Sequence, residues 1–142
     1  MRGQISLDLL FAVAIISITM LSVMNVALSE KTETEVLGTS AQLKAFAIDI
    51  RGTVARLYAS PGITVVKESP VELGPGEWIN VTLRADGYLQ IRAQIGGREY
   101  LVVQKLQVPP GTTSSVLLTQ TVREFKLSSR RLPDGVEVVV ET

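Results

Sequence analysis

The sequence contains no cysteine and no histidine among its 142 residues. Without thiolates or imidazoles it offers no cysteine nucleophile, no histidine base, no disulfide and few ligands for zinc, iron or copper. The chain has no excess of either charge, because 14 basic residues balance 14 acidic ones. Aromatic residues are also few, with seven in all. Nucleic-acid binding favours a basic surface with aromatics, so no nucleic-acid partner is expected. We expect a protein that is not an enzyme and uses no metal or cofactor.

What the chain does have is a long apolar run near its N-terminus. A short leader with Arg2 and Gly3 leads into Gln4, and after Asp8 come 20 residues without a charge, Leu9 to Leu28. As a helix this run is on the order of 30 Å long, enough to cross the hydrocarbon core of a bilayer. The positive charge before the run favours a cytoplasmic N-terminus, with the bulk of the chain outside.

Two conventional interpretations of this run are open. A secretory signal peptide would be cut near the small residues Ala27-Leu28-Ser29, but the run is longer than the usual ~7–15 residues. A single-span membrane anchor fits the length well. Neither explains why the carboxylate of Asp8 lies where hydrocarbon begins, or why Gly3 precedes the polar Gln4.

A third interpretation uses these polar residues. The pattern Gln4-x-Ser6-x-Asp8 after Arg2-Gly3 resembles the processing signal of archaeal type IV pilin-like proteins, called a class III signal peptide. The resemblance implies that a prepilin peptidase cuts between Gly3 and Gln4 and leaves the apolar helix on the mature chain. Asp8 then becomes the fifth mature residue, where the family usually has glutamate. The motif that starts archaeal flagellar-filament subunits is missing, which favours a pilus-like subunit over a motility filament.

The resemblance also implies the partners and the location. They are the peptidase, a membrane assembly platform with a cytoplasmic ATPase, and copies of the chain or sister pilins. The precursor would be inserted in the membrane, and the product would be a cell-surface filament that serves adhesion. In such a filament Asp8 would pair with the new amine on Gln4 of a neighbour, because an unpaired carboxylate beside hydrocarbon is costly. A solvated Asp8 at headgroup depth is the alternative. The alternative function is a membrane-anchored extracellular β domain that binds a ligand or partner and does not polymerise.

The residues after the apolar run predict a continuous amphipathic helix. No proline precedes Pro61, so a helix from Gln4 to about Ala59 is predicted, on the order of 84 Å long. At 100° per residue its second half has two opposite seams. The core seam contains Leu43, Phe46, Ala47, Ile50, Val54, Leu57 and Tyr58. The small-residue seam contains Ala41, Ala45, Ile48, Gly52, Ala55 and Ala59.

The two seams predict two partners. Bulky side chains suit the head of the same subunit, whereas alanine and glycine allow close approach of a neighbouring helix. We therefore expect the small-residue seam to pack against other subunits. Simple tolerance of alanine on an exposed helix is the alternative.

From residue 61 to 142 the hydrophobic period changes to alternation, which predicts a β-rich head. Tight turns are predicted at Asp86-Gly87 and Gly96-Gly97. Strands are expected at Ile63–Glu68, Glu77–Arg84, Tyr88–Ile95, Arg98–Val108 and Val136–Glu141, with Ser115–Val122 and Glu124–Ser128 as two strands or one bent strand. The predicted fold is α+β and pilin-like: residues 1–3 are a cleaved leader, and a long N-terminal helix (4–60), apolar first and then amphipathic, packs against an antiparallel sheet. A separate β-sandwich with its own core is the alternative.

Two smaller features concern possible sites in the head. Asn80-Val81-Thr82 matches the N-glycosylation sequon, and alternation with Ile79 and Val81 should point Asn80 outward. Such triplets also arise by chance. Glu68, Glu72 and Glu77 could bind a hard cation, but without EF-hand-like spacing solvated loop charges are favoured.

Overall fold

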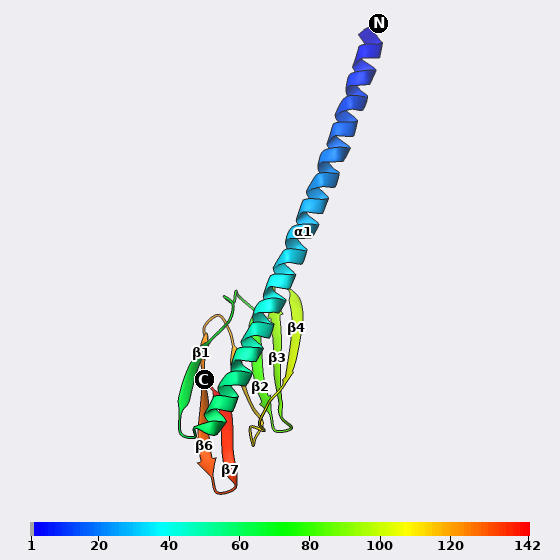
Figure 1. Ribbon diagram of the computed structural model, residues 1–142. Coiled ribbons are helices and arrows are strands. Elements are labelled where there is room, and N and C mark those ends of the chain that lie inside the picture. The colour runs from blue at the N-terminus through cyan, green and yellow to red at the C-terminus, as the bar shows by residue number, and fades with distance from the viewer. Residues whose placement is uncertain (1) are drawn as a thin grey trace. The chain divides into compact units, whose positions relative to one another are not determined.

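The computed structural model describes the backbone of residues 2–142 and the side chains of residues 6–142 (Figure 1). One helix, α1 (Arg2–Ala59), precedes seven strands. The strands are β1 (Thr64–Glu68), β2 (Trp78–Arg84), β3 (Tyr88–Ile95), β4 (Arg98–Lys105), β5 (Ser114–Leu118), β6 (Glu124–Leu132) and β7 (Gly135–Glu141). The chain divides into two compact units between Gly38 and Thr39, inside α1. The predicted α+β fold, with a long N-terminal helix and an antiparallel β head, is confirmed.

The C-terminal end of α1 is fixed by hydrogen bonds to the head. Ser60 N donates to Arg56 O at 3.0 Å, and the chain then reverses through Gly62, whose φ of 93° favours glycine. Gly62 N donates to both Ser129 O at 3.0 Å and Ser129 Oγ at 3.1 Å. The buried Ser129 therefore ties the helix stop to β6.

The strands form two antiparallel sheets, in the orders β1-β6-β7 and β4-β3-β2-β5. Both turns form where they were predicted, since Arg84 pairs with Tyr88 and Ile95 pairs with Arg98 across them. The first turn has three residues, Ala85 to Gly87, rather than the predicted two. The two sheets adjoin where the β5 segment meets β7. There Val138 N donates to Pro110 O at 2.9 Å, and Val140 N donates to Ser114 Oγ at 3.0 Å.

Some predicted strand limits were wrong. Strand β6 runs to Leu132 rather than Ser128, because its pairing with β7 continues to Leu132 and Gly135. Strand β4 ends at Lys105 rather than Val108, because its partner β3 begins at Tyr88, which pairs with Lys105. Strand β5 ends at Leu118, after which Thr119 N donates to Val122 O at 3.0 Å and closes a turn. The segments predicted as Ser115–Val122 and Glu124–Ser128 are two strands and not one bent strand, because β5 and β6 belong to different sheets.

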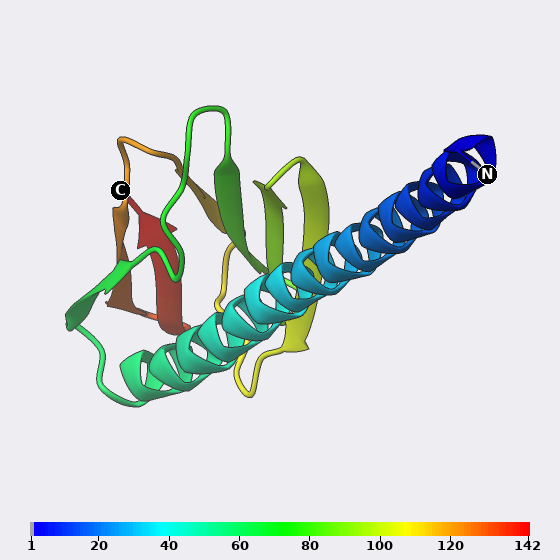
Figure 2. The same cartoon turned by 90° about the horizontal axis from the view of Figure 1, so that it is seen from above.

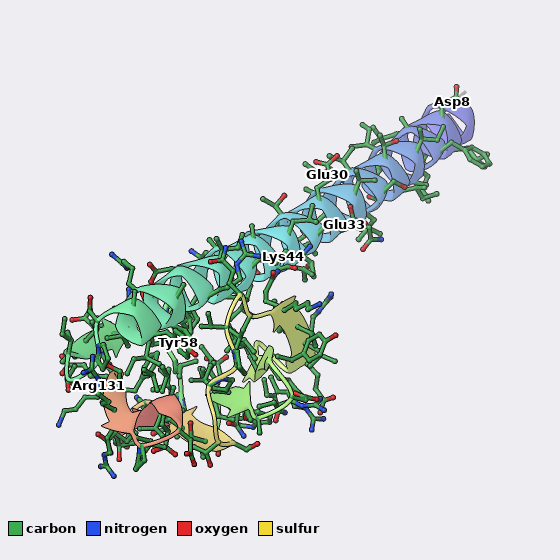
Figure 3. The ribbon with its side chains drawn as sticks, turned by 60° about the horizontal axis from the view of Figure 1, so that its bottom comes forward. Asp8, Glu30, Glu33, Lys44, Tyr58 and Arg131 are labelled. Atoms are coloured by element: carbon green, nitrogen blue, oxygen red, sulfur yellow. The ribbon has the colours of Figure 1, made fainter. Side chains whose placement is uncertain are left out.

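Within the unit that begins at Thr39, helix and sheets share one core. The six core-seam residues from Leu43 to Leu57 are at most 7% exposed and belong to the same cluster as the inner faces of both sheets. This part of α1 runs along one side of both sheets (Figures 1 and 2). Tyr58 is only half-buried, on the side of the helix that faces the strands (Figure 3). The sheets are therefore covered by the helix, and the alternative of a β-sandwich with a separate core is wrong.

Candidate membrane and assembly interface

The first candidate surface is the apolar segment of α1. Its large hydrophobic side chains between Leu7 and Leu28 are all 55–73% exposed, on every side of the helix. A helix of this length and composition can cross a membrane, and none of its apolar window is buried. A helix that is apolar all round is suited to an apolar environment such as lipid or other helices.

The three hydroxyl side chains inside this segment are compatible with such an environment. Ser17 Oγ donates to Val13 O at 2.8 Å, and Thr19 Oγ1 donates to Ile15 O at 2.8 Å. Ser22 Oγ likewise donates to Ile18 O, at 2.9 Å. Each hydroxyl thus bonds to a carbonyl one turn earlier in its own helix. These groups need no water, so they can lie in lipid or against other helices at small cost.

Charged residues bound the apolar segment at both ends. Asp8 lies exposed near the beginning of α1 (Figure 3). After Leu28 come Glu30, Lys31, Glu33 and Glu35, with an exposed contact of 4.0 Å between Lys31 Nζ and Glu35 Oε1. The predicted processing site, Gly3 and Gln4, falls on residues whose side chains lie outside the described part of the structure.

The small-residue seam is the second candidate surface. Ala41, Ala45, Gly52 and Ala59 are exposed, Ile48 is 52% exposed, and Ala55 is half-buried. At Gly52 an added Cβ would meet nothing within 4 Å, so the head of the same chain does not require glycine there. The seam is therefore open on the side of α1 away from the buried core seam.

Comparison with known proteins gives no match. No protein-family model, no curated protein sequence and no solved structure matches this chain.

In the head, Asn80 lies on β2 and is half-buried, on the face opposite Ile79 and Val81, which are both 0% exposed. Its Oδ1 is 3.4 Å from Thr82 Oγ1, the hydroxyl of the same sequon. The predicted alternation along this strand is confirmed.

Glu77 has a structural role that the sequence interpretation missed. Its Oε2 accepts from Gly74 N at 2.7 Å, and its Oε1 accepts from Gly96 N at 2.7 Å. These two backbone hydrogen bonds lower the pKa of the Glu77 carboxyl below its ordinary value. Glu77 is thus a loop clamp rather than a freely solvated charge. Among residues 6–142 no group of three acidic side chains is placed to hold a metal ion.

Proposed function

We propose that this chain is a structural subunit of an archaeal type IV pilus-like cell-surface filament. A prepilin peptidase would cut it between Gly3 and Gln4, and it would then polymerise through α1. The observation that carries the proposal is that α1 has two exposed apolar surfaces, the segment Leu7–Leu28 and the small-residue seam, that contribute no side chain to the core of the head. Adhesion to surfaces is the role that fits a filament covered by such heads.

The exposed apolar segment supports both stages of this proposal. Leaving a large aliphatic or aromatic side chain in water rather than burying it costs about 1.5–3 kcal/mol. Lipid would remove that cost for the precursor, and packed helices of other subunits would remove it for the filament. The assembly platform and its ATPase would move the subunit from the first environment to the second.

Asp8 and the small-residue seam would direct how neighbouring helices pack. Cleavage after Gly3 creates an amine on Gln4 at the same end of the helix as the Asp8 carboxylate. In a bundle, an Asp8 carboxylate pairing with the amine of another subunit would avoid leaving a charge unpaired in an apolar core. The seam from Ala41 to Ala59 would let a neighbouring backbone approach closely.

The experiment that tests the proposal is N-terminal sequencing of the full-length protein isolated from its own cells. We expect the mature chain to begin at Gln4. A chain that begins at Met1 would instead support a single-span anchor with an extracellular β domain, and one that begins near Glu30 would support a secreted domain. Electron microscopy of material sheared from the cell surface then shows whether the chain labels a filament.

A further inference from the structure

A cleft lies on the outer face of the four-stranded sheet, where β5 ends. It has a volume of about 400 Å³ and is lined by Trp78, Asn80, Leu117, Thr119, Gln120 and Thr121, among others. Trp78 and Asn80 stand two residues apart on the same face of β2, and Leu117 is the cross-strand partner of Asn80. The cleft therefore has an apolar floor beside a rim of hydroxyl and amide groups.

The indole of Trp78 is held in place within this cleft. Its Nε1 donates to Gln94 Oε1 at 3.1 Å, across the β2–β3 pair. Trp78 is also only half-buried, although large apolar residues of the sheet's inner face are fully buried. A hydrogen-bonded and partly exposed indole with nearby hydroxyls and amides is suited to a ring that is apolar on its faces and polar on its edge. A sugar ring has this chemistry.

The sequon places the attachment point for such a ring in the cleft. Asn80 begins Asn80-Val81-Thr82, and its side chain lines the cleft itself. Two residues along a strand span roughly 7 Å, a distance that one sugar joined to Asn80 can cover to reach the indole of Trp78. The Thr82 hydroxyl stands on the same face, 3.4 Å from Asn80 Oδ1, so both polar residues of the sequon are on the accessible side.

We propose that Asn80 carries an N-linked glycan whose first sugar lies on Trp78 in this cleft. In the transfer, Asn80 Nδ2 forms a bond to C1 of a sugar supplied by a lipid-linked oligosaccharide, and the lipid phosphate or pyrophosphate leaves. The amide nitrogen loses one proton in the same exchange. The glycan would cover the exposed indole and Leu117, which is itself 50% exposed. The proposal rests on an extracellular head, which is part of the proposed function.

Mass spectrometry of the full-length protein from its own cells tests the attachment. We expect the peptide that contains Asn80 to carry a saccharide. Asn80→Gln and Thr82→Ala should both abolish the added mass, whereas the matched Thr82→Ser retains the sequon and should keep it. An unmodified Asn80 in the wild-type chain overturns the proposal.

Tryptophan fluorescence tests the contact, because Trp78 is the single tryptophan of the chain. We expect wild type and Thr82→Ser to emit at shorter wavelength than Asn80→Gln and Thr82→Ala, and to be quenched less by acrylamide. A glycan that leaves the emission unchanged overturns the sugar–indole contact. If wild-type Asn80 proves unmodified and free monosaccharides bind the protein and shift its emission, the cleft is a site for exogenous sugar and the covalent proposal is wrong.

The N-terminus of the same preparation separates this proposal from the filament proposal. An unmodified Asn80 in a chain that begins at Gln4 overturns the glycan alone. A glycosylated chain that begins at Met1 overturns the filament subunit and leaves the glycan in place.

Discussion

Phe46 of α1 meets Phe125 of β6 edge to face, with ring centroids 5.9 Å apart and an interplanar angle of 85°. Both rings are buried, and their contact joins the helix to the three-stranded sheet. Aromatic pairs in this geometry contribute about 0.5–1.5 kcal/mol beyond the burial of their area. This contact is therefore a sensitive test of how much the helix contributes to the head.

Phe46→Ala is expected to destabilise the head by about 3–5 kcal/mol, because it removes a buried ring and leaves a cavity. Denaturant unfolding of the full-length chain in detergent, followed by Trp78 fluorescence, measures the change. Ile48→Ala is the matched control on the same helix, since Ile48 is 52% exposed and its truncation should cost far less. Equal losses for the two variants would show that the core seam does not support the head.

Ala45→Arg is expected to block filament assembly without unfolding the head. Ala45 is exposed, so the free energy of unfolding should change by about 0.5 kcal/mol or less. A long charged side chain would nevertheless prevent a neighbouring helix from approaching the small-residue seam. Filament yield by electron microscopy, together with the amount of membrane-inserted precursor, measures the effect. Gln42→Arg adds the same charge at an exposed position outside the seam and should assemble.

Normal assembly of Ala45→Arg would contradict the second seam as an interface. The alanines would then be residues that an exposed helix merely tolerates.

Asp8→Asn is expected to reduce assembly strongly while N-terminal processing at Gln4 continues. The amide keeps the size of the side chain but cannot offset the charge of a neighbour's amine inside an apolar bundle. Asp8→Glu preserves the charge and should assemble. Counting filaments and sequencing the N-terminus in the same cells distinguishes failed assembly from failed processing. A fully assembling Asp8→Asn chain would indicate a solvated Asp8 without a pairing role.

Glu77 should make head stability depend on pH in the acid range. Its pKa in the folded head is below the ordinary value of a glutamate, because Gly74 N and Gly96 N donate to the ionised carboxylate. Stabilisation from a lowered pKa is fully present above the unfolded value and is lost as pH falls through the folded value. Glu77→Gln should therefore destabilise the head at neutral pH and remove this part of the pH dependence. Denaturation midpoints measured from pH 7 downward check it.

Glu72→Gln is the matched control for that experiment, because Glu72 is an exposed carboxylate in the same loop. It should leave the profile close to wild type. If the two variants have the same pH profile, the Glu77 clamp does not contribute to stability.

Local patterns predicted much of this fold. The core seam from Leu43 to Leu57 could be recognised because burial on a helix repeats every 3.6 residues, and the hairpin turns because glycine tolerates a positive φ. The division into two sheets could not be predicted, because β1–β6 and β2–β5 pair residues far apart in the sequence. Strand ends depend on where a partner begins, as Tyr88 does for Lys105.

Some features of the candidate surfaces could be predicted from the sequence, and others could not. The apolar run is one continuous stretch and the small-residue seam repeats every three or four residues, so both could be recognised in the sequence. The hydrogen-bonding role of Glu77 could not be predicted, because its partners Gly74 and Gly96 come together only when β2 and β3 pair. The cleft beside Trp78 likewise forms only where the end of β5 meets β2.

The exposed apolar segment has a consequence for how assembly could be measured. Since the core of the head contains no side chain from residues 7–28, the proposed move of that segment from lipid to a helix bundle would require no refolding of the head. Assembly would then be a partition between two apolar environments, and its free energy would be the small difference between them. Detergent is a third such environment, so the detergent concentration that dissolves the filament would serve as a titration of subunit cohesion.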